Sequence, residues 1–360
     1  MKLRQDPGDF RVQERLDVPL DPEGPFTLYR LQKQGVTTEA AVGDLARRLR
    51  LPTFQIGVGG LKDAHAEAVQ HLTLPGSPKG VFSGKGWRLE PVGRVREALR
   101  PGATLGNAFG ITVRDLTKPQ AEAAVSRSSA VAKEGVPNYF DSQRFGGLAG
   151  GAGFVAKDWI EGRIEEGLKT LLTATYRGQN HREKVERERL AAGWGDWAAL
   201  AGSLSPGEAR GVAMYLRDHP GAFGNAIRCL REGTRWRTLA AYQSHLFNEA
   251  LSTRLKKDLP GGVEVEIRSG SLYFPLTGAL EGEAPWPLPQ EKIRQARLNL
   301  PKGERAPWVV PEELKVTGPE PDTLNHGRFL IRVSFALPPG SYATVVVKRL
   351  TYDAGHSFRA

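Results

Sequence analysis

Apolar and polar residues alternate with a period of two in several short segments of the first 145 residues. In residues 9–14, Phe10 and Val12 alternate with Arg11 and Gln13, which predicts a strand with one buried face. The other segments that we predict as strands in this region are residues 26–32, 54–58, 69–74 and 106–114.

Two segments of the same region carry helical patterns instead. Residues 40–51 are amphipathic and follow the pair Thr37-Thr38, in which a threonine can act as the N-cap. Residues 119–134 are rich in alanine. Strands and helices therefore alternate over this part of the chain.

A glycine-rich stretch, residues 146–153, ends this alternation. Beyond it the pattern becomes mostly helical, with helices predicted over residues 157–172, 183–192, 205–217 and 239–257. Residues 261–319 are rich in proline and glycine, and strand patterns return over residues 327–337 and 342–350.

This order of patterns predicts a domain inserted into another domain. A chain that leaves one sheet, builds a second domain and then returns explains why strands reappear only near the end. We expect one domain from residues 1–160 and 320–360, and an inserted domain from residues 161–319.

The charge of the chain favours a polyanionic partner. It has 50 Lys and Arg residues against 40 Asp and Glu residues, a net charge of +10, and the excess is spread along the chain. A folded basic surface suits nucleic acid binding, although charge alone is weak evidence because many enzymes are this basic.

Other features of the composition narrow the class of protein. The single cysteine, Cys229, excludes an intramolecular disulfide and a Cys-rich zinc site. No apolar run approaches the roughly 18 residues that a membrane span needs, and the first residues contain no apolar signal region. We expect a cytoplasmic protein.

Residues 60–70 contain the first candidate for chemistry. Asp63 follows Lys62, just after the pair Gly59-Gly60, where the backbone can come close to a ligand. A carboxylate at such a place can be a nucleophile, a base or an ion-pair partner, and these residues alone favour a turn ion pair with Lys62. His65 can act as a base, but its position favours a role as the cap of the next segment.

Residues 137–146 combine aromatic rings, amides and an arginine. Asn138 and Phe140 have the chemistry to read base edges and to stack on bases. A junction loop with Phe140 and Phe145 in the core explains the same residues equally well.

Two further segments are candidates for binding. Residues 240–251 have helical spacing and predict a packed helix, with Gln243 and Asn248 as candidate contacts. Residues 337–344 predict a tight turn into a strand, where Tyr342 either points into a site or fills the sheet face.

Common nucleotide and hydrolase motifs are missing. The chain contains no Walker loop, no Gly-x-Gly-x-x-Gly opening a helix, no Gly-x-Ser-x-Gly and no His-Glu-x-x-His. His65 and His71 are thin support for a metal site. Chemistry without a cofactor or a metal is favoured.

Taken together, four blocks resemble the TruD family of pseudouridine synthases, which act on tRNA. The blocks are residues 6–14 (Asp-Pro-Gly-Asp-Phe-Arg-Val-Gln-Glu), 60–66 (Gly-Leu-Lys-Asp-Ala-His-Ala), 138–146 (Asn-Tyr-Phe through Arg-Phe-Gly) and 337–344 (Leu-Pro through Gly-Ser-Tyr-Ala-Thr). Residues 243–248 are similar to a fifth block. The blocks follow the family's order and span the chain from near residue 4 to residue 350.

The resemblance implies an α/β (α+β) fold. This fold has a pseudouridine synthase core with a mixed, largely antiparallel sheet, interrupted by an inserted TRUD-type domain. The resemblance also implies isomerisation of the uridine at position 13 of tRNA to pseudouridine, without cofactor or metal. The expected partner is tRNA, and we expect the protein to be a monomer.

The resemblance also assigns roles to residues. The family's catalytic aspartate falls on Asp63, and a family lysine falls on Arg4, as the cation opposite the aspartate. The residues that the family places around the uridine fall on Phe10, Asn138, Phe140 and Tyr342. Three routes stay open: attack of Asp63 at the sugar, removal of a proton to give a glycal, and addition to the base.

Four positions depart from the family pattern. Gly8 stands where Glu is usual, Arg4 replaces Lys, Asp141 stands where Gly is usual and Ala68 replaces a frequent Thr. Arg4 and Asp141 alter the expected charge balance near Asp63 but leave its carboxylate in place. The alternative function, a non-catalytic RNA-binding protein or RNA chaperone, explains the charge and the aromatic residues but not the joint presence of the blocks.

Overall fold

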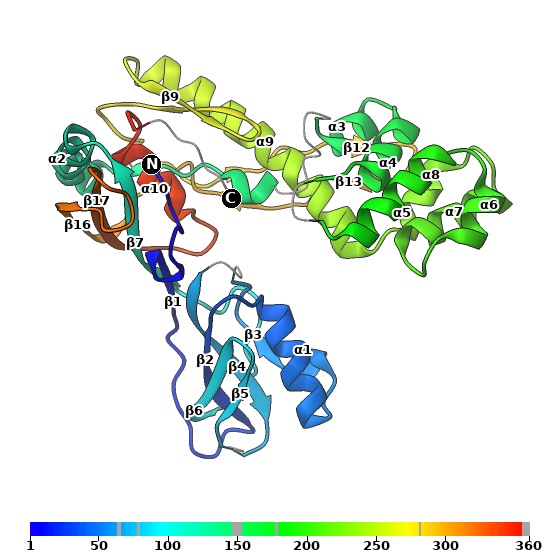
Figure 1. Cartoon of the computed structure of the whole chain (residues 1–360), viewed down its shortest axis with the longest axis horizontal. Helices are drawn as coiled ribbons and strands as arrows, with labels where there is room; N and C mark the ends of the chain where they lie inside the picture. The colour runs from blue at the N-terminus through cyan, green and yellow to red at the C-terminus, as the bar shows by residue number, and fades with distance from the viewer. Residues whose placement is uncertain (63–65, 78–79, 146–152, 177–178, 281, 355–360) are drawn as a thin grey trace. The chain divides into compact units, whose positions relative to one another are not determined.

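The computed structural model describes residues 1–62, 66–77, 80–145, 153–176, 179–280 and 282–354 (Figure 1). The chain divides into two compact units. Unit 1 consists of Met1–Asn138, Leu276–Glu281 and Trp308–Ala360, and unit 2 consists of Tyr139–Pro275 and Gly282–Pro307. Unit 1 is therefore built from both ends of the chain, and most of unit 2 from its middle.

Unit 1 contains one large sheet. Its nine strands are β1 (Phe10–Arg15), β2 (Phe26–Lys33), β3 (Gly57–Val58), β4 (Glu67–Pro75), β5 (Phe82–Gly84), β6 (Trp87–Val95), β7 (Gly106–Leu116), β16 (Glu312–Pro321) and β17 (Phe329–Leu337). The order is β16-β17-β7-β1-β4-β2-β6-β5, and β3 pairs with β4. Within the described part of this sheet, β1 and β4 run parallel and the other pairs run antiparallel. The predicted mixed, largely antiparallel sheet is confirmed.

Burial along the strands shows why some were predictable and others were not. In β1, Phe10, Val12 and Glu14 are buried while Arg11 and Gln13 are exposed, as the alternation predicts. β16 is an edge strand with two prolines and little buried surface. Edge strands tolerate charge and proline, so β16 has no alternating apolar signature.

Two helices of unit 1 begin at threonine caps. α1 (Thr38–Leu49) follows Thr37, whose side chain accepts a hydrogen bond from the backbone of Ala40. α2 (Lys118–Glu134) follows Thr117, which forms a capping box with Gln120. The helices predicted over residues 40–51 and 119–134 are confirmed.

The strand predicted over residues 342–350 is wrong, because these residues form helix α10 (Ala343–Leu350). The run Val345, Val346 and Val347 has strand propensity, since branching at Cβ restricts the side chain in a helix. All three valines are buried, and α10 packs against α2. Tertiary burial of this helix outweighs the local preference.

Two other predicted elements differ from the structure. Residues 54–58 contain a short 3₁₀ turn and only the two-residue strand β3; Phe54 is 83% exposed, so the apolar run does not mark a buried strand. The single helix predicted over residues 157–172 is two helices. They are separated near Gly162, whose φ of +87° suits glycine.

Unit 2 is mainly helical. Its helices are α3 (Val155–Ile160), α4 (Ile164–Thr173), α5 (His181–Ala192), α6 (Trp197–Ser203), α7 (Glu208–Asp218), α8 (Phe223–Ala226) and α9 (Glu232–Asp258). Trp159, Leu168, Leu190 and Leu216 are among the residues that pack into one apolar core. The helices predicted over residues 183–192, 205–217 and 239–257 correspond to α5, α7 and α9.

The remaining strands form short two-stranded pairs. In unit 2, β9 (Val263–Ile267) pairs with β10 (Gly270–Phe274), β11 (Trp286–Pro287) with β14 (Glu304–Arg305), and β12 (Lys292–Ile293) with β13 (Leu298–Asn299). In unit 1, β8 (Val136–Pro137) pairs with β15 (Trp308–Val309). The pair of β8 and β15 thereby joins two segments of unit 1 that are distant in sequence.

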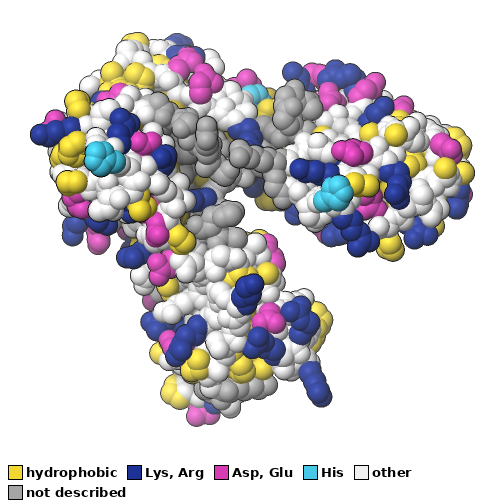
Figure 2. Space-filling view, in the orientation of Figure 1, with side chains coloured by type: hydrophobic (Ala, Val, Ile, Leu, Met, Phe, Trp, Pro, Cys, Tyr) yellow, Lys and Arg dark blue, Asp and Glu magenta, His cyan; other side chains and the backbone are white. Residues whose placement is uncertain are grey.

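Positive charge is distributed over the surface. Figure 2 shows Lys and Arg side chains scattered over the visible face, interspersed with Asp and Glu side chains. Across the part of the chain that the structure describes, no helix has the length and apolar character needed to cross a membrane.

Candidate active site

Asp63, the candidate nucleophile, lies outside the described residues, and so does His65. The described residues on either side of this gap are Lys62 and Ala66. β4 begins at Glu67, which lies opposite Arg11 of the parallel strand β1. The site must therefore be built from the residues that hold these flanks.

A buried ion pair holds Lys62. Glu14, the third inward-facing residue of β1, has a side chain without exposed surface, and its Oε1 lies 3.2 Å from Nζ of Lys62. The backbone N–H of His71 donates to Oε2 at 2.8 Å. Burial alone would raise the pKa of Glu14, but the hydrogen bond from His71 and the charge of Lys62 outweigh it and lower the pKa below its ordinary value.

Hydrogen bonds from α1 and β4 fix the segment before Asp63. The backbone N–H of Lys62 donates to Oγ1 of Thr38 at 2.9 Å, and this hydroxyl donates to Oε1 of Gln70 at 2.8 Å. Gly59 packs too closely for a side chain, because a Cβ there would lie 2.7 Å from Cγ2 of Thr104. The residues leading to Asp63 therefore have defined positions.

Arg4 and Phe10 are in contact. The guanidinium carbon of Arg4 lies 4.3 Å from the centroid of the Phe10 ring, a cation–π arrangement. Phe10 is only 5% exposed, and its ring meets Phe109 of β7 edge-on at 6.3 Å. Arg4 thus covers one face of a largely buried ring, and its charge is held beside the start of β1.

Asn138 and Tyr342 belong to the same unit as Arg4 and Phe10. Asn138 is 6% exposed and directly follows β8. Tyr342 is half-buried and is the N-cap residue of α10. Tyr342 therefore precedes a helix and not the predicted strand.

Two buried polar atoms of unit 1 have no hydrogen-bond partner among the described residues. They are Oδ1 of Asn107 and Oγ of Ser341. In the sheet register Asn107 lies opposite Glu14 and also opposite Leu337, the last residue of β17. Because an unpaired buried polar atom costs free energy, such atoms mark places where a ligand or a water molecule can bind.

Phe140 belongs to unit 2, where a helix residue holds its backbone. Oδ1 of Asn248 accepts from the Phe140 N–H at 2.9 Å, and Nδ2 of Asn248 donates to the Phe140 carbonyl at 2.8 Å. The guanidinium carbon of Arg305 lies 3.9 Å from the centroid of the Phe140 ring. Phe140 is 7% exposed and meets Phe247 edge-on.

Three residues hold parts of the candidate site in place, but the sequence interpretation did not give them this role. Glu14 is the last residue of the first block, and a carboxylate at an inward-facing strand position was the available signal. Asn248 was read as a candidate contact but binds the Phe140 backbone. Arg305, only 9% exposed, lies in the Pro- and Gly-rich region and had no signal.

The described residues contain no group of three or more His, Cys, Asp or Glu side chains placed to hold a metal ion. The titratable pair that the structure does place near the candidate nucleophile's segment is Glu14 with Lys62. This pair has the character of a buried structural ion pair, since each of the two charged groups already has a partner.

Comparisons with known proteins agree on one family. The family model described as tRNA pseudouridine synthase D (TruD) matches residues 1–266. The probable tRNA pseudouridine synthase D of Methanopyrus kandleri is 31% identical over 97% of this chain and 91% of its own length. The tRNA pseudouridine synthase D of Geobacter sulfurreducens is 30% identical over 98% of this chain and 94% of its own length.

A solved structure gives the same picture for the fold. The crystal structure of the putative tRNA pseudouridine synthase D from Methanosarcina mazei superposes with a TM-score of 0.68, covering 97% of this chain and 93% of that one. Its sequence is 22% identical, so the match concerns the fold alone. The matches to the two relatives and the fold match extend over nearly the whole chain.

Proposed function

Since the chain belongs to the tRNA pseudouridine synthase D (TruD) family and is therefore an isomerase, we propose that it converts uridine 13 of tRNA to pseudouridine with Asp63 as nucleophile and without a cofactor. The observation that carries this proposal is the family match over residues 1–266, which includes the block with Asp63. The ion pair of Glu14 and Lys62 supports this proposal, because the pair fixes the segment that leads to Asp63.

An ionised Asp63 is required by each of the three routes of glycosidic cleavage. A neighbouring cation lowers the pKa of a carboxyl group and keeps it ionised. Lys62 is already paired with Glu14, which favours Arg4 as this cation. The Phe10 ring holds the guanidinium of Arg4 in place through their stacking.

The target base must leave its RNA stack before it can react. Flipping a nucleotide out costs a few kcal/mol, which aromatic stacking and hydrogen bonds in the pocket repay. Asn138, Phe10 and Tyr342 supply an amide and two aromatic rings within unit 1. The detached uracil rotates and forms its new bond through carbon, so water has to be excluded while it is held.

Incubation with unmodified tRNA should produce pseudouridine at position 13 without added metal or cofactor. Pseudouridine has the same mass as uridine, so carbodiimide treatment followed by primer extension gives the position of the product. Binding of tRNA without any pseudouridine would instead support the non-catalytic RNA-binding protein or RNA chaperone.

Changes at the predicted base-binding residues should reduce turnover more than tRNA binding. Asn138→Ala removes an amide, and Phe10→Leu removes the ring while keeping most of the volume in a buried position. We expect each to lower kcat by about 10- to 100-fold, because a misplaced base rarely reaches the reactive geometry. The tRNA Kd should change less than threefold.

Single-turnover rates and filter-binding measurements on each variant separate these two effects. Thermal unfolding of the variants checks that unit 1 stays folded. Equal losses in kcat and in tRNA binding would show that Asn138 and Phe10 only bind RNA.

A further inference from the structure

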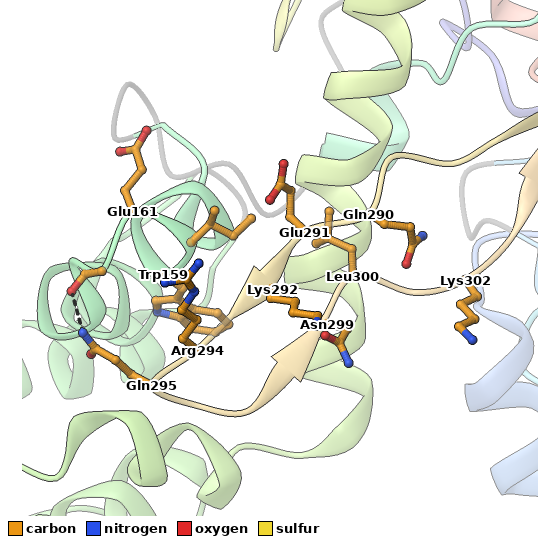
Figure 3. Close-up of a pocket in the computed structure, with 12 residues that line it drawn as sticks. Trp159, Glu161, Gln290, Glu291, Lys292, Arg294, Gln295, Asn299, Leu300 and Lys302 are labelled. Carbon is orange, nitrogen blue, oxygen red and sulfur yellow. Dashed lines mark hydrogen bonds between the residues drawn. The ribbon is translucent and has the colours of Figure 1, made fainter.

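Unit 2 contains a large pocket that the proposed reaction does not use. Its volume is about 820 Å³, within the range of ligand-binding pockets. The end of α3 forms one wall, and the hairpin of β12 and β13 with its flanking residues forms the other (Figure 3). All the lining residues belong to unit 2.

The hairpin that lines this pocket is firmly anchored. Its apolar residues Ile293, Ala296 and Leu300 are at most 1% exposed and pack into the core of unit 2. Nε2 of Gln243 in α9 donates to the carbonyls of Pro289 and Pro301, at 2.9 and 2.6 Å. The two arms of the hairpin are therefore held at a fixed separation before any ligand binds.

The polar side chains of the hairpin are presented to solvent from this rigid base. Lys292 and Asn299 lie opposite each other in the strand register, so their side chains share one face, as Figure 3 shows. Nε2 of Gln295 lies 3.5 Å from the carbonyl of Gly162, which links the hairpin tip to the end of α3.

Positive charge dominates the hairpin wall of the pocket. Lys292, Arg294 and Lys302 are exposed, and within the described residues none of them forms a hydrogen bond or an ion pair with a carboxylate. Glu161, on the opposite wall, is engaged by Arg163 and Lys157. Glu291 is the one carboxylate among the described hairpin residues that line the pocket, so three cations outnumber it on this wall. This excess of positive charge favours the binding of an anion.

We propose that this pocket binds the phosphodiester backbone of the tRNA substrate, away from the reacting uridine. The identity of the RNA as tRNA rests on the proposed function. Lys, Arg and amide groups are the usual donors to phosphate oxygens, and such contacts position an RNA without reading its sequence.

Backbone binding is favoured over base binding because the pocket offers no stacking surface. Trp159 is the aromatic residue among those lining the pocket, and it is 1% exposed in the core. Sequence-specific recognition of single-stranded RNA depends on exposed rings that stack on bases. The contact should therefore be electrostatic and insensitive to the bound sequence.

A triple variant, Lys292→Gln, Arg294→Gln and Lys302→Gln, tests the proposal. All three side chains are exposed, so the fold should be retained. We expect the tRNA Kd to rise about tenfold or more near 0.1 M salt, and the slope of log K against log salt to become shallower by about 2 to 3. The value of kcat at saturating tRNA should not change.

The matched control changes the same net charge elsewhere in unit 2. Lys169→Gln, Lys257→Gln and Arg268→Gln replace three exposed cations that do not line the pocket. This control should keep the salt slope close to that of the unaltered protein. A second control, Lys292→Arg with Lys302→Arg, keeps all three positive charges because Arg294 is unchanged. This variant should also bind tRNA tightly.

The outcomes separate this inference from the proposed function. If the unaltered protein forms pseudouridine in tRNA but the triple variant binds tRNA with unchanged Kd and salt slope, the pocket proposal is overturned while the function holds. If no pseudouridine forms but the triple variant still binds tRNA more weakly than the control and with a shallower salt slope, the pocket binds RNA and the proposed function fails. Equal loss in both triple variants would assign the effect to net charge and overturn the pocket.

Discussion

Replacing Asp63 with Asn should reduce pseudouridine formation by about 1,000-fold or more, while tRNA binding changes little. Asparagine has nearly the shape of aspartate but cannot ionise, so it can neither attack the sugar or base nor accept a proton. The loss should appear in kcat, since the carboxylate of the proposed nucleophile would act in the transition state. Single-turnover pseudouridine formation and tRNA binding, measured on the same preparation, check this.

Asp17→Asn provides a matched control for this substitution. Asp17 is exposed in unit 1, and among the described residues it forms no ion pair. The control should retain the rate of the unaltered protein. A near-normal rate in the Asp63→Asn protein would remove Asp63 as the nucleophile, whichever route of cleavage applies.

The elements that sequence patterns predicted are those whose burial follows local periodicity. β1 alternates Phe10, Val12 and Glu14 inward, and threonine caps mark where α1 and α2 begin. α10 escaped prediction because its Val345–Val347 run has the local preference of a strand, and only its packing against α2 decides for a helix. Local signals cannot report such a tertiary contact.

The candidate site rests on the family blocks more than on residue chemistry. Read alone, Lys62 was a partner for its neighbour Asp63, but the structure pairs it with Glu14, 48 positions earlier. Arg305 reaches the Phe140 ring from 165 positions further along the chain. Pairings over such separations depend on the fold, so no local pattern could have predicted them.

The roles of the helix block also changed once the fold was known. Gln243 and Asn248 have the side chains of RNA contacts, yet one bridges two carbonyls of the hairpin and the other binds the backbone of Phe140. Amide side chains satisfy backbone groups as readily as base edges. Their presence in a block therefore indicated the architecture of unit 2 as much as a binding surface.

Glu14→Gln should destabilise unit 1 by about 3–5 kcal/mol, because it leaves the ammonium of Lys62 buried without a counter-charge. The side chain of Lys62 is 10% exposed and that of Glu14 is not exposed at all. Urea unfolding, together with hydrogen exchange at the amides of β1 and β4, measures the loss where the pair lies.

The pH dependence of stability should change as well. The pKa of Glu14 is lower in the folded protein than its ordinary value of 4.5, so the pair stabilises the fold above that pH. This contribution is lost as the pH falls further, through the lowered pKa of the folded state, where the carboxylate becomes protonated. The Glu14→Gln protein lacks this group and should show a smaller loss of stability over the same acid range.

Glu67→Gln is the matched control for Glu14→Gln, because it breaks an ion pair of the same sheet at the surface. Glu67 pairs with Arg11 at 3.2 Å, with side chains 49% and 68% exposed. Exposed pairs contribute at most about 1 kcal/mol, so this variant should unfold close to the unaltered protein. Equal, small effects of the two substitutions would mean that Lys62 reaches water when its partner is removed, and that Glu14 does not brace the segment leading to Asp63.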